Sequence, residues 1–236
     1  MSEETTSAPA GTAAADCEDG SEQDCRRWRR RRDARPGEIL DAAMDLFVEK
    51  GFAAARMEEI AQRAGVTKGT VYLYYESKDA LFRAVVQEMV LPTLAEGERI
   101  VAEWTGTTRA LLGETIRRWW AAVQQPRFAC LKLITGESSN FPELARYYVD
   151  QVVHRGRRLF ESVLVRGMEA GEFRTDLDVP TVGRLAVAPL LNAALYKHSL
   201  LRFDDEPFDF DSYINLHIEF FLCAIAKETD KEASDA

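Results

Sequence analysis

Apolar residues recur every three or four positions along most of this 236-residue chain, and this spacing constrains the fold more than any other feature. The first such stripe follows Pro36, which lacks an N–H but suits the first turn of a helix, and it stops at Gly51. Nowhere do apolar and polar residues alternate between turn residues, as they do in a strand with one buried face. The sequence therefore predicts an all-α fold. The first stripe consists of Ile39, Leu40, Ala43, Leu46 and Phe47.

The same spacing, together with glycine, proline and capping residues, predicts the order of the helices. Thr67 and Ser77 carry side chains that cap helix N-termini, and Asp178 is expected to do the same. Pro189 is expected to kink the helix that contains it. The expected helices span residues 36–50, 57–64, 68–75, 78–86, 108–125, 128–135, 142–170, 179–201 and 208–227.

The charge of the chain is unevenly distributed. The formal net charge is −9, and an evenly acidic protein is a poor partner for nucleic acid. However, residues 1–25 contain seven acidic and no basic residues, whereas residues 26–35 contain seven arginines and one aspartate. The first segment has Met1 as its only large apolar residue, so we expect it to be disordered. A short, strongly basic segment then precedes the first expected helix.

Several classes of protein are excluded by what the sequence lacks. No run approaches the ~18–20 apolar residues of a membrane span, and the acidic N-terminus does not have the pattern of a signal peptide. The cysteines are scattered, the histidines form no metal-binding pattern, and no phosphate-binding glycine loop or serine-nucleophile motif occurs. We therefore expect no metal, no cofactor, no catalytic site and a reducing cytoplasm. Cys130 and Cys223 are expected to pack as small, buried apolar residues.

Residues 57–75 have the pattern of a helix-turn-helix. Ala64 and Gly65 supply the small residues that the turn needs, and Val66 is the apolar residue that follows it. The second helix would present polar and small side chains to a DNA groove, and the free N–H groups at its start can meet phosphates. The residues expected at this surface are Thr67, Lys68, Gly69, Thr70, Tyr72, Tyr74 and Lys78.

The run from Gly51 to Phe82, GFAAARMEEIAQRAGVTKGTVYLYYESKDALF, resembles the DNA-binding region of the TetR/AcrR family of bacterial transcriptional regulators. The resemblance implies that the second helix of the motif enters the major groove, and that Thr67, Tyr72 and Lys78 contact phosphates. It also implies that the helices that follow form a ligand-binding and dimerisation domain. The matching elements are Gly51-Phe52, Ile60-Ala61, Ala64-Gly65-Val66, Thr67-Lys68-Gly69-Thr70, Tyr72, Tyr75, Ser77-Lys78 and Ala80-Leu81-Phe82.

Three positions depart from the pattern of the family. Ala55-Arg56 stand where Thr or Thr-Ser usually enters the first helix of the motif. The change removes a side-chain cap worth about 1 kcal/mol of helix stability, and it places an arginine where it can reach a phosphate. Tyr75 stands where Phe is commoner, and Leu73 replaces a frequent His. The resemblance holds despite these changes.

The arginine run beside the motif is expected to act as a DNA-binding arm, because comparable arms reach the minor groove and contact phosphates. A solubilising segment is the alternative. The acidic tail before it could fold back and compete with DNA, or it could be a flexible leader without such a role. The complete set of expected DNA-binding residues is Arg30, Arg31, Arg32, Arg56, Thr67, Lys68, Gly69, Thr70, Tyr72, Tyr74 and Lys78.

The resemblance divides the chain into four parts: a disordered acidic tail and Arg-rich arm (1–32), a helix-turn-helix domain (33–80), a ligand-binding and dimerisation domain (81–228) and a flexible C-terminus (229–236). A two-fold dimer is expected, because one short recognition helix buries too little surface to be specific alone. The last two helices are the expected interface, although their residues also fit the core of one chain. The expected interface residues are Ala186, Leu190, Ala193, Ala194, Tyr213, Leu216, Phe220 and Phe221.

A ligand pocket is expected among the middle helices, where aromatic and polarizable side chains are frequent. Glu137 and His154 are the polar candidates for orienting a ligand. Aromatic residues at helical spacing also fit an ordinary core, so both interpretations apply to each of them. The expected pocket residues are Trp104, Trp119, Trp120, Phe128, Leu131, Glu137, Tyr148, His154 and Met168.

Together these features predict a cytoplasmic, homodimeric repressor that associates with the nucleoid when bound to double-stranded operator DNA. A small lipophilic or aromatic effector would displace the fourth helix, change the spacing of the recognition helices and release the operator. An enzyme with an accessory helix-turn-helix is one alternative, and an interaction protein that has lost DNA binding is another. Activation also stays open, because the sign of regulation depends on the position of the operator.

Overall fold

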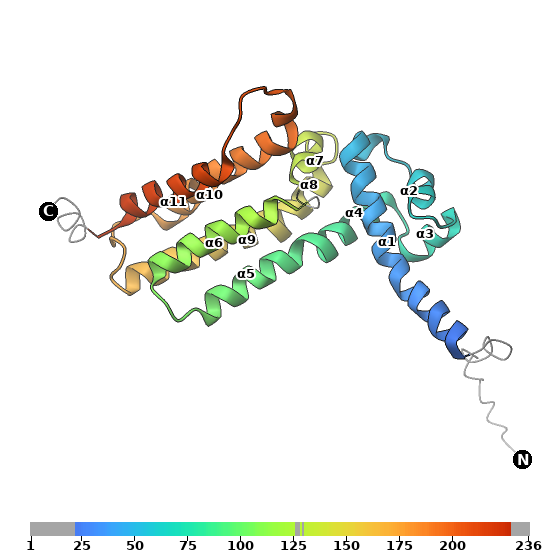
Figure 1. The fold of residues 1–236 in the computed structure, drawn as a ribbon, viewed down its shortest axis with the longest axis horizontal. Helices are drawn as coiled ribbons and strands as arrows, with labels where there is room; N and C mark the ends of the chain where they lie inside the picture. The colour runs from blue at the N-terminus through green and yellow to red at the C-terminus, as the bar shows by residue number, and fades with distance from the viewer. Residues whose placement is uncertain (1–21, 126–127, 129, 228–236) are drawn as a thin grey trace, which may run out of the picture.

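The computed structural model describes residues 22–125, 128 and 130–227, and within them the chain forms helices and no strand. The helices α1 to α4 lie at one end, beside a bundle of longer helices (Figure 1). An isolated bridge between Phe173 and Ala226 ties the segment after α9 to the end of α11. The all-α prediction is confirmed. Across the described ranges, no helix combines the length and the apolar character that a bilayer crossing requires.

Four helices form the N-terminal end: α1 (Glu22–Ala54), α2 (Met57–Arg63), α3 (Lys68–Tyr74) and α4 (Lys78–Val85). The helical path of α1 is interrupted at Gly51, which adopts a φ of 83°, close to the expected end of the first helix. The expected start at Pro36 is wrong, because α1 begins at Glu22 and contains Pro36 in its interior. Arginine is a good helix former and acidic residues suit a first turn, so the arginine run extends the helix.

The remaining helices include one that the spacing does not predict. A π-helical turn (Val86–Val90) continues α4 into α5 (Leu91–Glu103), where Pro92 lies in the first turn and needs no N–H. A second π-helical turn (Val149–Val153) divides the expected helix 142–170 into two. The other elements are α6 (Thr108–Val123), α7 (Cys130–Glu137), α8 (Pro142–Tyr148), α9 (His154–Glu169), α10 (Val179–Ser199), a 3-10 turn (Leu201–Phe203) and α11 (Phe210–Ile225).

Two local predictions are corrected. Asp178 precedes α10, but its side chain makes no capping hydrogen bond to any described residue, whereas Asp209 caps α11 through the N–H groups of Asp211 and Ser212. Cys130 is buried as expected, but Cys223 is exposed on α11. The expected disorder of residues 1–21 and the expected flexibility of residues 229–236 concern segments outside the described residues.

Buried apolar side chains form two clusters. The first packs α1 to α4 together with residues of α7 and α8, such as Leu133 and Leu144. The second joins α6, α9, α10 and α11 around residues such as Phe160 and Leu190. The core of the N-terminal end therefore includes side chains from beyond the expected domain boundary at residue 80. The α7–α8 hairpin thus packs against the N-terminal helices.

Candidate nucleic-acid interface and ligand cavity

The connection between α2 and α3 has the geometry of a helix-turn-helix. Gly65 adopts a φ of +67°, a left-handed conformation that residues with a Cβ rarely adopt, and it turns the chain after α2. Thr67 then caps α3, because its Oγ1 accepts a hydrogen bond from the Thr70 N–H at 3.2 Å. The inner face of α3 is held by Val71, which is fully buried. These local contacts fix the orientation of α3 on the rest of the N-terminal end.

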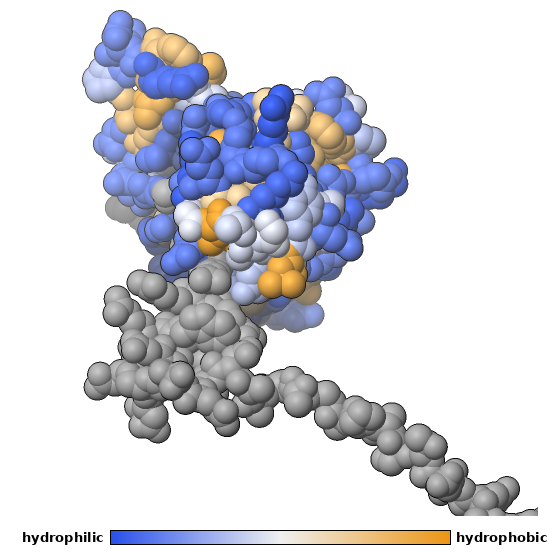
Figure 2. Space-filling model, turned by 90° about the vertical axis from the view of Figure 1, so that its right-hand side faces the viewer, coloured by the Kyte–Doolittle hydropathy of each residue, from blue (hydrophilic) through white to orange (hydrophobic). Residues whose placement is uncertain are grey.

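The outer face of α3 and its N-cap carry four of the eleven expected DNA-binding residues. Thr67, Lys68 and Gly69 are exposed at the start of the helix, and Tyr72 is 43% exposed one turn later. The side chains of Thr70 and Tyr74 are half-buried, and Tyr74 packs against the first core. The surface at this end of the molecule is largely hydrophilic, with small hydrophobic patches (Figure 2). The outer face is thus suited to a polar, hydrated partner.

Lys68 is held on the outer face by its neighbours. Its ammonium forms an ion pair with Glu58 of α2 and lies 5.6 Å from the centre of the Tyr72 ring. The hydrogen bond between the two side chains raises the pKa of Lys68 and lowers the pKa of Glu58. Because both side chains are exposed, the pair adds little to stability. Lys68 can therefore exchange Glu58 for a phosphate at small cost.

The side chain of Lys78, at the start of α4, makes hydrogen bonds that the sequence does not predict. Its Nζ donates to the carbonyl oxygens of Phe52, Ala53 and Ala55 at 2.5, 3.0 and 3.0 Å. It also lies 4.6 Å from the centre of the Phe52 ring. Burial lowers the pKa of Lys78, while the negative charges of Asp79 and Glu137 act in the opposite direction. Since an ammonium has three donors, a phosphate contact would require Lys78 to give up one of these carbonyls.

The four arginines of the expected DNA-binding set stand on two elements. Arg56 is exposed at the N-cap of α2, and its side chain makes no capping hydrogen bond within the described part of the chain. The backbone of Arg30, Arg31 and Arg32 lies in α1, so the arm is helical here. A helix about 10–12 Å wide exceeds a minor groove about 6 Å wide. A helical arm would have to lie along the phosphates, whereas an arm that also reaches the minor groove was expected from the sequence.

Replacing Thr67 by Ala separates the role of this residue in folding from its role at the DNA surface. We expect the loss of the cap to lower the free energy of unfolding by ~1 kcal/mol and also to weaken DNA binding. Thr107 is a matched control, because its Oγ1 caps α6 in the same way, through the Ala110 N–H at 3.2 Å. Denaturant unfolding and DNA titrations of both variants test this. Equal DNA affinity in Thr67→Ala and Thr107→Ala would remove Thr67 from the interface.

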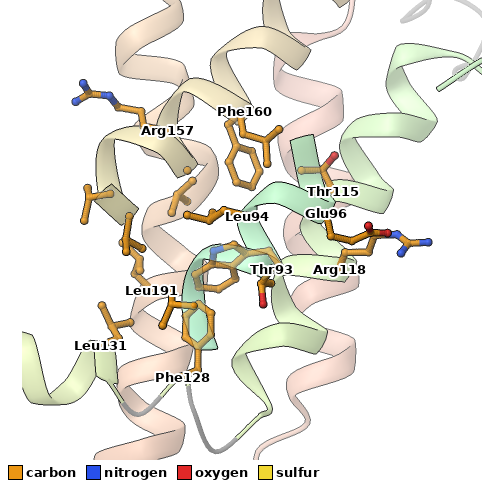
Figure 3. Close-up of a pocket in the computed structure, with 18 of the residues that line it drawn as sticks. Thr93, Leu94, Glu96, Thr115, Arg118, Phe128, Leu131, Arg157, Phe160 and Leu191 are labelled. Atoms are coloured by element: carbon orange, nitrogen blue, oxygen red, sulfur yellow. The ribbon is translucent and has the colours of Figure 1, made fainter. Parts of the chain in front are cut away.

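A cavity of about 760 Å³ lies within the helical bundle, among α5, α6, α9 and α10. Its walls are mainly apolar, and Figure 3 shows Leu94, Phe128, Leu131, Phe160 and Leu191 around it. Two of its aromatic rings, those of Trp119 and Phe128, meet edge to face with centroids 5.5 Å apart. A cavity of this size and character is suited to a lipophilic small molecule.

The charged side chains that line the cavity already have partners. Arg118 pairs with Glu114 at 2.5 Å, and Glu96 pairs with Arg99 at 2.7 Å. Arg157 lies 3.3 Å from Glu161, and Arg184 donates to the carbonyl oxygen of Pro180 at 3.1 Å. In Figure 3, the side chains of Arg118 and Arg157 extend away from the apolar centre. The apolar centre of the cavity therefore favours the lipophilic part of a ligand over a charged group placed there.

Four of the nine expected pocket residues line this cavity: Trp119, Phe128, Leu131 and Tyr148. The other five do not line this cavity. Trp104, Trp120 and Met168 pack in or against the second core, His154 lies 3.5 Å from Asp150, and Glu137 contacts α1.

One wall of the cavity, formed by α5, was not expected from the sequence. Leu94, Gly97 and Ile100 line it, but α5 itself is not predicted by the spacing. On α9, Gly156 and Phe160 complete the opposite wall. Gly97 and Gly156 let α5 and α9 approach each other closely, because a Cβ at Gly97 would lie 3.0 Å from Leu159 and a Cβ at Gly156 would lie 3.7 Å from Leu94.

Comparisons with known proteins decide the family. Residues 39–85 match the model of bacterial regulatory proteins of the tetR family, and residues 102–208 match the model of the tetracyclin repressor-like C-terminal domain. The chain belongs to the TetR family. The family consists of DNA-binding transcriptional regulators, so the chain is a regulator of this kind and the enzyme alternative is excluded.

Three relatives of this TetR-family regulator illustrate the range of the family. The transcriptional activator FasR of Mycolicibacterium smegmatis is 38% identical over 93 residues, which cover 39% of this chain and less than half (42%) of FasR. The transcriptional repressor KstR2 of Rhodococcus jostii is 27% identical over 143 residues, covering 60% of this chain and 69% of KstR2. The solved complex of SmeT with triclosan is 24% identical, covers 83% of this chain and 93% of SmeT, and has a TM-score of 0.69. The likeness to SmeT concerns the fold.

The expected dimer residues of this regulator fall into two groups. Ala186, Leu190, Ala193, Ala194 and Phe221 are buried in the second core of one chain, which leaves little of their surface for a partner. Tyr213 is half-buried, and its hydroxyl lies 3.5 Å from the carbonyl oxygen of Pro189. By contrast, Leu216 and Phe220 are 47% and 66% exposed on α11. Leu185 of α10 is also exposed, at 59%. These three apolar side chains are the ones on α10 and α11 best placed to contact a partner.

Proposed function

We propose that this TetR-family regulator is a homodimeric repressor and that an uncharged, lipophilic effector releases it from its operator. The observation that supports this most is the 760 Å³ apolar cavity in the domain that follows the helix-turn-helix. An occupant of that cavity is in contact with α5, which continues directly from α4 through the π-helical turn. DNA and effector would then favour different arrangements of the same helices.

DNA recognition is proposed to centre on α3. Lys68, Gly69 and Tyr72 lie on its exposed face, and the capped start of the helix directs backbone N–H groups outward. A seven-residue helix makes few base contacts, so specificity requires two copies on two half-sites. Leu216, Phe220 and Leu185 are proposed to hold the second copy through α10 and α11.

The repressor role is supported by KstR2, a repressor, although FasR is an activator. Transcription in vitro from the promoter beside the gene tests the sign. We expect the purified protein to reduce the transcript, and a lipophilic compound that binds the cavity to restore it. A transcript that rises when the protein is added would make the regulator an activator. A transcript that no cavity-binding compound changes would refute control by an effector.

The arginine arm is proposed to add phosphate contacts. Deleting residues 1–32 is expected to weaken operator binding and to flatten its dependence on salt, because each lost phosphate contact removes about 0.9 from the slope of log K against log salt. Deleting residues 1–21 alone is the matched control, since it keeps all the arginines. DNA titrations at several salt concentrations measure both slopes. An unchanged slope after the longer deletion would remove the arm from the mechanism.

A further inference from the structure

The α7–α8 hairpin connects the cavity to the DNA-binding end. Leu131, near the start of α7, and Tyr148, at the end of α8, line the cavity. Glu137, the last residue of α7, and Phe141, just before α8, contact the end of α1. Leu131 and Glu137 are six residues apart on one helix, or about 9 Å along its axis. The helix α7 therefore reaches from the cavity to the end of α1.

The contact between α7 and α1 is close. The Glu137 Oε1 accepts a hydrogen bond from the Ala53 N–H at 3.4 Å, and the Phe141 ring meets the Phe52 ring edge to face at 4.7 Å. A Cβ at position 51 would lie 2.9 Å from the Glu137 Oε1, so the carboxylate reaches this position because residue 51 is glycine. The Oε2 accepts from the Asn140 amide at 3.1 Å, which orients the carboxylate.

Ala53 is shared between Glu137 and Lys78. Its N–H donates to Glu137, and its carbonyl oxygen accepts from the Lys78 ammonium at 3.0 Å. Lys78 begins α4 and follows the end of α3 at Tyr74 by four residues. A displacement of Glu137 would thus shift the segment around Ala53, to which Lys78 is hydrogen-bonded. The start of α4 would then move, and the orientation of α3, which precedes it, would change.

The junction also has room to rearrange. A hollow of about 360 Å³, lined by residues such as Val48, Leu133 and Glu137, lies between α1 and α7. Free volume at this contact lets α7 move without forcing apart a tightly packed core.

We propose that Glu137 is the positioning residue that couples the effector cavity to DNA binding, through Ala53 and Lys78. This inference rests on the proposed control by an effector. Occupation of the cavity shifts Leu131 and Tyr148, α7 moves, and the Glu137 contact with the end of α1 is lost. The recognition helix α3 then loses the orientation that it has in this structure.

Triclosan is the probe for the test, and Glu137→Ala is the main variant. Quenching of tryptophan fluorescence reports binding, since Trp119 lines the cavity, and fluorescence anisotropy of labelled upstream DNA reports DNA affinity. In the wild-type protein we expect triclosan to weaken DNA binding about tenfold. In Glu137→Ala we expect that factor to fall below about twofold, while the triclosan Kd changes less than twofold. Glu137→Gln keeps an acceptor for the Ala53 N–H, so it is expected to retain most of the coupling.

Glu143→Ala is the matched control, because Glu143 is exposed on α8 of the same hairpin and pairs with Arg146. Full coupling in Glu137→Ala, or an equal loss in Glu143→Ala, would overturn the assignment. If triclosan does not bind, Gly156→Leu takes its place, because the new side chain points into the cavity beside Leu94. Gly156→Leu is then expected to weaken DNA binding in the wild-type background and not in Glu137→Ala. The same loss in both backgrounds, or no loss in the wild type, refutes the coupling.

Control by an effector and the route through Glu137 can be refuted separately. If triclosan binds and coupling survives in Glu137→Ala, the route through Glu137 is wrong and control by an effector stands. If triclosan binds the wild-type protein without any change in DNA affinity, and Gly156→Leu also leaves that affinity unchanged, both the effector function and the route are refuted.

Discussion

Replacing Gly69 by Asp is expected to abolish operator binding, with a loss of affinity of about 100-fold or more, while the fold is retained. Gly69 is exposed on α3, and the nearest atom to an added Cβ would be the Thr67 Oγ1 at 3.9 Å, an ordinary contact. An acidic residue in the first turn of a helix is also favourable for folding. Against DNA, however, the carboxylate faces phosphates, and like charges at an interface cost several kcal/mol.

Thr181→Asp is the control for this variant. Thr181 is exposed in the first turn of α10, so the substitution adds the same charge to the first turn of a helix other than α3. DNA titrations and thermal unfolding of both variants separate the effects. If Gly69→Asp binds the operator as tightly as Thr181→Asp does, α3 does not face the DNA.

The double variant Leu216→Glu/Phe220→Glu is expected to be a folded monomer that has lost about 100-fold or more in operator affinity. Both side chains are largely exposed, so the change leaves the core of the single chain intact. In a two-fold dimer the new carboxylates face their own copies, and like charges there separate the chains. Operator affinity then falls, because linking two half-site contacts raises affinity by roughly 10²–10⁴ over one contact.

Light scattering and DNA titrations test this second prediction. Val165→Glu is the control, because Val165 is 41% exposed on α9 and is not among the proposed interface residues. We expect it to remain dimeric and to bind DNA normally. A double variant that stays dimeric would show that α11 does not form the interface.

The parts of the structure that were predictable from sequence depend on local contacts. The turn at Gly65 and the Thr67 cap involve residues a few positions apart, so their pattern is readable in one short window. The contacts of Lys78 are different, because its carbonyl partners lie 23 to 26 residues earlier in the chain. Nothing in the local sequence around Lys78 indicates that its ammonium is already bound.

The helix α5, which the spacing does not predict, contains Pro92 and Gly97, two residues that disfavour a helix interior. In the structure Pro92 occupies the first turn, after a π-helical turn, and Gly97 allows close approach of α9, since a Cβ there would lie 3.0 Å from Leu159. The small residues of α10 were assigned to a dimer interface for another reason. Ala186 and Ala193 allow close approach of a neighbouring helix, and sequence alone does not show whether that neighbour belongs to the same chain. The same ambiguity applies to Trp120, which stacks on Phe210 in the core and does not line the cavity.

The central claim is that one dimer binds DNA and a lipophilic effector in competition. Anisotropy of labelled upstream DNA, titrated with the protein in the presence and absence of dodecan-1-ol, triclosan or progesterone, tests it most directly. We predict that at least one compound weakens DNA binding about tenfold, and that DNA weakens the binding of that compound by the same factor. DNA affinity that is unchanged by every compound that binds the cavity would contradict the account.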